Sequence, residues 1–258
     1  MSDEARDPWR LQGRVALIAG AGRGLGRGCA LELAAAGAKV VLASRTLAEV
    51  QAVAGEVAAL GAEAVALEAD VTVESEVQRL VDRAAEIGDL RVLVAAAGTN
   101  RPGPAREYPI ADWDALFDVN VRASFLCCRA FGDNLLRRGA SGSIVTLSSQ
   151  MGSVGYPGRV AYCATKHAVN GMTKALAVEW AREGIRVNAV APTFVDTPLA
   201  APYFADPAFR EEVLERRLPT GKLAQVEDVA RAVRYLACDA STSVTGHILR
   251  VDGGWTAW

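Results

Sequence analysis

The sequence has few of the residues that bind metals or form disulfide bridges. It contains only two histidines, His167 and His247, and they are not clustered with other ligand types. Its five cysteines are odd in number and include no Cys-x-x-Cys pair: Cys29, Cys127, Cys128, Cys163 and Cys238. We therefore expect no metal site, and we expect reduced, mostly buried thiols in a cytoplasmic protein.

Long apolar runs and a surplus of either charge are also missing. No apolar stretch reaches the ~18 residues that a membrane-spanning helix needs, and residues 1–10 are charged rather than apolar. The 28 basic and 30 acidic residues give a formal net charge of −2, with no basic stripe. These properties argue against a membrane protein, a secretory signal and a nucleic-acid partner. We expect residues 1–10 to be a flexible tail and 11–258 to be one domain.

Apolar residues, in contrast, make up 51% of the 258 residues, which is enough for one large core. Short apolar runs bounded by glycine alternate with longer helical patterns. Strands are expected at 14–19, 39–43, 64–67, 90–96, 143–147, 185–190 and 247–251. Helices are expected at 25–36, 47–60, 72–87 (with Thr72 as the cap), 111–137, 160–181 and 225–238. This alternation predicts an α/β fold: a single-domain, doubly wound, mostly parallel Rossmann-like sheet with helices on both faces.

One long segment does not follow the alternation. Residues 192–207 hold four prolines and several aromatic residues, which is too broken a pattern for regular structure, and a short helix is expected at 208–217. Long irregular insertions in a compact domain often cover a binding site. We therefore predict a substrate lid over about 193–220.

A glycine-rich turn follows the first expected strand. Gly20, Gly24 and Gly26 have the spacing GxxxGxG, which allows a tight turn and a close approach of the backbone to a diphosphate at a helix N-terminus. Such a turn favours a cofactor site, although a tight strand–helix connection is the alternative when the turn is taken alone. The second strand ends in Ser44-Arg45, where sheets that bind NAD usually carry an acidic residue. With Arg23 nearby, this favours a 2′-phosphate, and hence NADP(H) over NAD(H).

A second motif lies on the helix expected at 160–181. Tyr162 and Lys166 are one turn apart on the same helix face, and Ser149 lies in the loop before it. An ammonium group close to a phenol lowers its pKa, and a serine hydroxyl can hold the oxygen of a carbonyl or an alcohol. These groups suit carbonyl reduction or alcohol oxidation with hydride from a cofactor.

The order of the motifs resembles the short-chain dehydrogenase/reductase family over about 13–255. The resemblance rests on GxxxGxG, Asp70, AAAG at 95–98, Asn120, Ser149, YxxxK and Pro192. It implies that Tyr162 is the acid/base, that Lys166 lowers its pKa and holds the nicotinamide ribose, and that Ser149 orients the substrate oxygen. It also implies that Asn120 interrupts the helix and holds a water that links Lys166 to solvent.

The same resemblance implies a set of cofactor contacts, with Asp70 on the adenine. They are Gly20, Arg23, Gly24, Leu25, Gly26, Ser44, Arg45, Asp70, Val71, Ala96, Gly98, Val119, Tyr162, Lys166, Pro192, Val195 and Thr197. Three positions depart from the family pattern. Ala19 replaces a common threonine, AAAG replaces NNAG with the loss of two side-chain hydrogen bonds, and Thr193 replaces a glycine.

The substrate is expected to contact Ser149, Gln150, Tyr156 and Phe194, with Trp113 nearby. The runs 149–155 and 251–258 resemble sugar-acid and polyol dehydrogenases of the gluconate 5-dehydrogenase type. The alternative is a 3-oxoacyl-thioester reductase, which would need a basic patch for its acidic carrier protein. Three arginines are available for such a patch: Arg101, Arg106 and Arg159.

A third possibility is a non-catalytic NADP(H)-sensing protein, but such proteins usually lack the catalytic Tyr or Lys. The helices at 111–137 and 160–181 carry apolar and small residues on several faces. Family members pair through these helices and the last strand, so the resemblance implies a homotetramer, with Trp255 and Trp258 near a subunit contact.

Overall fold

Seven parallel strands form the centre of the fold in the computed structural model, which describes residues 7–197 and 200–257. The strands are β1 (Arg14–Ala19), β2 (Lys39–Ser44), β3 (Ala64–Glu68), β4 (Asp89–Ala95), β5 (Gly142–Leu147), β6 (Ile185–Pro192) and β7 (Ile248–Val251). Their order in space is β3-β2-β1-β4-β5-β6-β7, and every neighbouring pair is parallel. This confirms the doubly wound sheet, whose winding reverses between β1 and β4.

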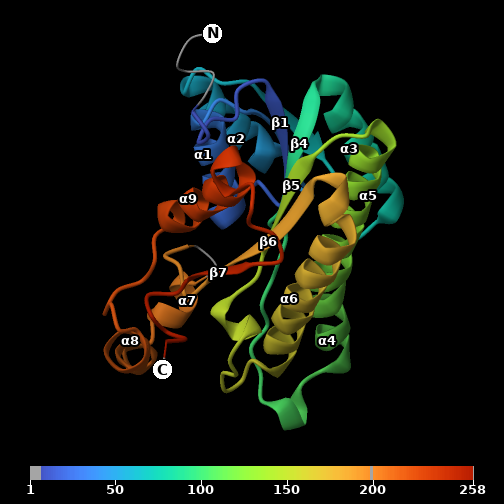
Figure 1. Cartoon of the computed structure of the whole chain (residues 1–258). Coiled ribbons are helices and arrows are strands. Elements are labelled where there is room, and N and C mark those ends of the chain that lie inside the picture. The colour runs from blue at the N-terminus through green and yellow to red at the C-terminus, as the bar shows by residue number, and fades with distance from the viewer. Residues whose placement is uncertain (1–6, 198–199, 258) are drawn as a thin grey trace.

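Helices cover both faces of the sheet (Figure 1). One face is covered by α1 (Gly24–Ala35), α2 (Leu47–Ala59) and α9 (Val226–Ala237). The other face is covered by α3 (Glu74–Ile87), α4 (Ile110–Phe117), α5 (Ala123–Arg138) and α6 (Val160–Trp180). Each face has its own apolar core, and this explains why the central strands are apolar along their whole length rather than alternating. No helix of the described residues is long and apolar enough to cross a membrane.

Two predicted helices differ from the structure in a way that matters for the site. The single helix predicted at 111–137 is interrupted by a π-helical turn, Asp118–Arg122, which contains Asn120. The third helix begins at Glu74 rather than at Thr72, and Thr72 does not cap it. The Thr72 backbone N–H and hydroxyl instead donate to the Asp70 carboxylate at 2.9 and 2.7 Å, because an aspartate side chain readily accepts from the backbone N–H two residues on and closes a turn.

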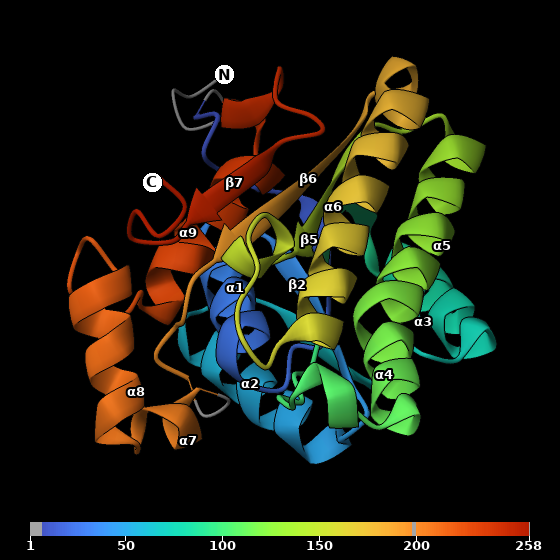
Figure 2. The same ribbon diagram turned by 90° about the horizontal axis from the view of Figure 1, so that it is seen from below.

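The segment between β6 and α9 leaves the sheet and forms α7 (Ala201–Phe204), α8 (Pro207–Glu211) and a π-helical turn, Glu212–Arg217. Figure 2 shows α7 and α8 beside the main layers rather than within them. The helix predicted at 208–217 is confirmed as α8 with the turn that follows it. The prediction that 192–207 has no regular structure is wrong for α7. Residues 198 and 199 of the predicted lid lie outside the described residues.

Part of the segment predicted as a tail is docked on the fold. Residues 1–6 lie outside the described part of the chain, but Pro8 and Trp9 belong to the fold. The Trp9 ring lies 5.7 Å from that of Tyr235, its carbonyl accepts from Arg234 at 3.1 Å, and the Pro8 carbonyl accepts from the Ala240 N–H at 3.0 Å. An aromatic side chain in an otherwise charged segment was the sequence signal for this docking.

Candidate active site

The glycine turn between β1 and α1 is built for close backbone contacts. Gly20 has a φ of +88°, and a Cβ there would lie 2.6 Å from the Ala97 nitrogen. A Cβ on Gly26 would lie 2.0 Å from the Gly20 carbonyl oxygen. Gly24 differs, because a Cβ there would meet only Thr197, at 4.0 Å. The close backbone contacts at Gly20 and Gly26 therefore hold the shape of the turn. The lack of a side chain on Gly24 leaves a space between the first turn of α1 and Thr197.

This space fits the diphosphate of a dinucleotide. The N-cap of α1, Arg23, makes no side-chain cap hydrogen bond among the described residues, so the first N–H groups of the helix are available to a ligand. Leu25 is half-buried in the same turn. The side chain of Thr197 is held by a hydrogen bond to the Val195 carbonyl at 3.3 Å, and Val195 is in turn bridged to Ala224.

Two side chains of opposite charge bear on the choice of cofactor, Arg45 at the end of β2 and Glu49 in the first turn of α2. Arg45 is exposed, and the Ser44 hydroxyl bonds within its own turn, accepting from the Thr46 N–H at 3.2 Å and donating to its carbonyl at 2.9 Å. Sequence reasoning missed Glu49, whose carboxylate lies against the glycine turn: a Cβ on Gly22 would be 2.5 Å from its Oε2. Its position in the first turn of α2 was the available signal.

Asp70 lies after β3, as predicted for the adenine contact. Burial acts to raise the pKa of Asp70, but the two hydrogen bonds from Thr72 and the positive charge of Arg45 lower it below its ordinary value. The carboxylate therefore stays ionised and is available as an acceptor. Val71 beside it is buried.

Asn120 joins three parts of the site. Its Oδ1 accepts from the Thr99 N–H at 2.8 Å, and its Nδ2 donates to the Thr99 carbonyl at 3.0 Å and to Thr165 Oγ1 at 3.1 Å. These bonds fix the loop after β4 against α6 and take the place of side-chain bonds that the AAAG sequence cannot make. A Cβ on Gly98 would lie 3.4 Å from Asn120 Oδ1 and 3.8 Å from Lys166 Nζ. Gly98 thus borders both groups, with Ala96 just before it in the loop and Val119 in the π turn.

Ser149 and Lys166 are both held by neighbours at the end of β5. The Ser149 hydroxyl donates to Gln150 Oε1 at 3.0 Å and accepts from the Met151 N–H at 3.2 Å. Lys166 Nζ donates to the Leu147 carbonyl at 2.8 Å and lies 5.5 Å from the centre of the Tyr162 ring. Ser149, Tyr162 and Lys166 are therefore brought together where β5 meets α6.

The pKa values of Tyr162 and Lys166 differ from those that the sequence predicted. Burial raises the pKa of Tyr162 to about 12, and contact with Ser149 and the positive charge of Arg159 offset this only in part. Burial also lowers the pKa of Lys166 to about 8. The sequence predicted a phenol acidified by Lys166, but in the structure loss of hydration dominates both groups. The lysine at the same time binds a backbone carbonyl rather than the phenol.

Three buried polar atoms have no partner among the described residues: Asn100 Oδ1, Arg159 Nη1 and Thr193 Oγ1. They lie beyond β4, before α6 and beyond β6, which is the edge of the sheet where the carboxyl ends of the strands meet. Buried polar atoms are nearly always hydrogen-bonded in proteins. Unpartnered buried atoms at this edge therefore indicate a ligand site; Arg159 acts on Tyr162, and Thr193 follows Pro192, the predicted nicotinamide contact.

An aromatic cluster fastens the segment predicted as a lid to this edge. The Phe194 ring lies 5.5 Å from those of Phe204 and Phe209, 5.8 Å from that of Trp255 and 6.2 Å from that of Tyr156. Tyr156 and Phe194 are thus brought together in one cluster, and their contact with the substrate stays a prediction. Trp113 does not join them, because on α4 it stacks on Phe117 at 4.9 Å.

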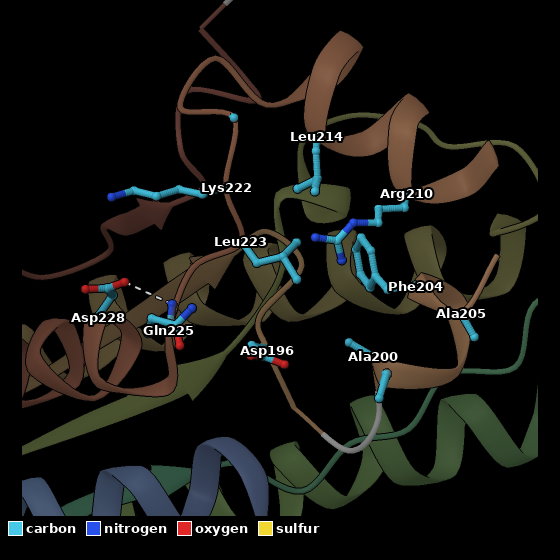
Figure 3. A pocket seen from close by; sticks show the side chains of 12 residues that line it. Asp196, Ala200, Phe204, Ala205, Arg210, Leu214, Lys222, Leu223, Gln225 and Asp228 are labelled. Atoms are coloured by element: carbon cyan, nitrogen blue, oxygen red, sulfur yellow. Dashed lines mark hydrogen bonds between the residues drawn. The ribbon is translucent and has the colours of Figure 1, made fainter. Parts of the chain in front are cut away.

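A cavity of about 700 Å³ lies on the other side of the lid, between α7 and α8 and the segment before α9. Figure 3 shows Leu214 and Leu223 pointing into it from opposite walls, with Arg210 and Phe204 beside them. None of the proposed catalytic residues lines it. The lid thus packs on the body mainly through the aromatic cluster. The described residues contain no group of three or more His, Cys, Asp or Glu side chains that could hold a metal.

Residues 20–256 match the family model described as Enoyl-(Acyl carrier protein) reductase. The chain is a short-chain dehydrogenase/reductase. It is 36% identical over 249 residues to D-threitol dehydrogenase of Mycolicibacterium smegmatis, covering 96% of this chain and 95% of that protein. It is 38% identical to a 3-oxoacyl-[acyl-carrier-protein] reductase of Synechocystis sp., covering 95% and 97%.

Among solved structures, this short-chain dehydrogenase/reductase is similar to a gluconate 5-dehydrogenase from Burkholderia cenocepacia J2315 in complex with NADP and tartrate. The TM-score is 0.93 at 35% identity, covering 98% of this chain and 99% of that one. The protein is thus an NAD(P)-dependent oxidoreductase acting on CH–OH groups, and the alternative of a non-catalytic nucleotide sensor is set aside.

Proposed function

We propose that the enzyme interconverts a secondary alcohol and a ketone, with Tyr162 as the acid/base. The observation that carries this proposal is the meeting of Ser149, Tyr162 and Lys166 at the carboxyl edge of the sheet, with Gly98 bordering Lys166. A nicotinamide cofactor, when bound, supplies or accepts the hydride. Gly20, Gly24, Gly26, Asp70, Lys166 and Thr197 are among the residues that would hold it.

Each side chain of the group has a separate task. Ser149 donates a hydrogen bond to the reacting oxygen in place of Gln150 and so holds it near Tyr162. With its pKa raised to about 12, Tyr162 is protonated at neutral pH and can give its proton to the oxygen of a ketone. Lys166 places a cation beside the phenol that stabilises the phenolate left behind. Asn120 fixes α6 and carries the proposed water that reconnects Lys166 with solvent.

We propose a sugar acid or a polyol as the substrate. The similarity to a threitol dehydrogenase and to a gluconate 5-dehydrogenase that binds tartrate supports this class. Gln150 is buried next to Ser149 and can both donate to and accept from a hydroxyl group.

The 3-oxoacyl-thioester alternative has weaker support. Arg101 is paired with Asp112, and Arg159 is buried, so two of the three arginines considered for a carrier-protein patch are not free on the surface. Of these three arginines, only Arg106 is both exposed and outside an ion pair among the described residues. A single exposed arginine makes a poor docking surface for an acidic protein.

A substrate panel tests the proposed function. Purified enzyme is assayed by NADPH absorbance with ketoses, keto acids of sugars and an acetoacetyl thioester, and in the reverse direction with polyols and sugar acids. We expect turnover of at least one polyol or sugar acid and slow or no turnover of the thioester. Turnover of the thioester alone contradicts the proposal.

We further propose that NADP(H) is preferred over NAD(H). Arg45 and Arg23 are both exposed at the end of β2 and in the glycine turn, where a 2′-phosphate would lie. Glu49 opposes this preference, because its carboxylate borders the same turn and repels a phosphate. The preference is thus a balance between guanidinium attraction and carboxylate repulsion.

Two variants are expected to change the preference for NADP(H) in opposite directions. Arg45→Ala removes a charge-assisted contact and lowers the NADP/NAD ratio of kcat/KM about 10-fold or more. Glu49→Gln removes the repulsion and raises the same ratio. Steady-state kinetics with both cofactors measures the two effects, with Arg79→Ala, an exposed arginine on α3, as the control. Equal efficiency of the unaltered enzyme with NADH and NADPH contradicts the preference.

We also propose a homotetramer. Large apolar side chains are exposed on the helices of one face, including Ile110, Phe125 and Val178, which is 83% exposed. Such an exposed set on adjacent helices is typical of a subunit interface. Light scattering is expected to give about four times the 27.2 kDa of one chain. Val178→Glu is expected to lower this mass, whereas Val73→Glu, an exposed position just before α3, is not; a monomeric wild-type protein contradicts the proposal.

A further inference from the structure

Arg159 is a buried arginine beside the proposed acid/base. It is the N-cap of α6, three residues before Tyr162, and its positive charge acts on the Tyr162 phenol. Arg159 is only 4% exposed, and its Nη1 reaches no acceptor among the described residues. Burying an unpaired guanidinium is costly, and such a group normally has a carboxylate or carbonyl partner.

Two carboxylates that act on the same tyrosines as Arg159 are already paired with other arginines. Asp112 accepts from Arg101, and Glu212, on the lid, lies 3.5 Å from Arg217. No acidic side chain of the described residues lies within ion-pair distance of Arg159. The partner for its buried N–H groups is therefore expected to come from a bound molecule rather than from the chain.

The lid orients this guanidinium without neutralising it. Its central carbon lies 4.5 Å from the centre of the Tyr203 ring on α7. Stacking on a ring occupies the flat face of a guanidinium and leaves the N–H groups in its plane free for hydrogen bonds. The cation also reaches the phenols of Tyr162 and Tyr156, whose pKa values burial raises and Arg159 lowers in part. Arg159 thus lies between the lid and the reacting group.

We propose that Arg159 binds the carboxylate of the substrate and so makes the enzyme select hydroxy acids and keto acids over neutral polyols. The inference rests on the proposed function and narrows its substrate class. A guanidinium fork matches a carboxylate with two parallel hydrogen bonds, whereas a hydroxyl can satisfy only one of its N–H groups and no charge. Removal of water by the lid strengthens this discrimination.

Equilibrium binding tests the inference independently of turnover. D-Gluconate and D-glucitol share one carbon skeleton and differ in the carboxylate, so they form a matched pair. Calorimetry is done on the full-length protein saturated with NADPH, which prevents oxidation of either compound. We expect Arg159→Gln to weaken gluconate binding about 100-fold relative to glucitol, since it removes one partner of a buried charge pair. Arg159→Lys, which keeps the charge but not the fork, is expected to weaken it less.

Two further variants separate charge recognition from a structural role. Arg106→Gln removes an exposed arginine and is expected to leave gluconate binding as it is. Tyr203→Leu removes the stack but keeps the cation, and is expected to affect both compounds alike. The inference is overturned if the wild-type protein binds neither gluconate nor tartrate. It is also overturned if Arg159→Gln weakens the binding of gluconate and glucitol equally, or if Tyr203→Leu weakens gluconate binding relative to glucitol as much as Arg159→Gln does.

Failure of the proposed function gives a different result. If the substrate panel shows no turnover while gluconate binding still depends on Arg159, the proposed reaction fails and the anion site stands. If polyols and sugar acids are turned over but Arg159→Gln leaves their relative kcat/KM unchanged, only the role of Arg159 is wrong.

Discussion

Replacing Tyr162 by phenylalanine is expected to lower kcat about 1,000-fold or more, because the substrate oxygen loses its proton donor. The phenyl ring keeps the shape and the contacts of the site, so the fold and cofactor binding should survive. Kinetics with a substrate identified by the panel measures the loss, and titration of NADPH fluorescence measures cofactor binding. The control is Tyr235→Phe, which alters a tyrosine packed on Trp9 far from α6.

The pH dependence of ketone reduction and alcohol oxidation is a second test of the role of Tyr162. Because the pKa of Tyr162 is raised to about 12, the phenol stays protonated through neutral and mildly alkaline pH. Ketone reduction should then be nearly independent of pH below about 8 and fall above it, where Lys166 loses its charge, whereas alcohol oxidation, which needs the phenolate, should rise with pH where Lys166 is still charged. Loss of this rise in Tyr162→Phe supports the assignment. Turnover that survives the substitution shows that another group carries the proton.

Replacing Lys166 by methionine is expected to have opposite effects on activity and on stability. Activity should fall about 100-fold or more, since no cation remains beside the phenol. The free energy of unfolding at neutral pH should rise, because the folded protein no longer buries an ammonium group. The loss of the hydrogen bond to the Leu147 carbonyl offsets part of this gain.

The stability effect has a predictable direction with pH. The pKa of Lys166 is about 8 in the folded protein and 10.5 in an unfolded chain. Between these values the unfolded chain binds a proton that the folded protein has lost, so Lys166 makes stability rise with pH across this window. The advantage of Lys166→Met over wild type should therefore shrink by on the order of 2–3 kcal/mol from about pH 8 to about pH 10.5.

Urea unfolding of both proteins at several pH values measures this difference. The buried thiols are common to both proteins and cancel in the comparison, and Tyr162, with a pKa of about 12, titrates above this window. Lys174→Met, an exposed lysine on the same helix, is the control and should show no such trend. A constant difference between wild type and Lys166→Met across the window contradicts the burial of a charged lysine.

The sequence predicted the sheet well because the pattern of a parallel sheet is strong. Strands such as β1 and β4 are buried on both faces and read as apolar runs, and glycines such as Gly37 and Gly61 mark the helix ends. The π turn at Asn120 was predictable only from the family resemblance. Its cause is tertiary, because the Asn120 side chain bonds to Thr99 and Thr165, which are distant in sequence.

The site was predicted where a motif fixes residues at short spacing, and was missed where distant charges meet. Tyr162 and Lys166 lie on one helix face, so their proximity follows from helix geometry. Glu49 comes close to Gly22 only because α2 packs beside the glycine turn. The isolation of Arg159 depends on which other arginines take the nearby acids, which no local pattern reveals. The raised pKa of Tyr162 likewise reflects burial, which the sequence does not report.

The aromatic cluster has a practical consequence for handling the protein. Trp255 is close to the carboxyl terminus and packs directly on Tyr156 and Phe194, at 5.8 Å from each. An affinity tag or fusion partner placed just after it would press on the lid and alter access of substrates to Tyr162. The opposite terminus approaches α9 through Trp9, well away from the lid, and is the safer place for a purification handle.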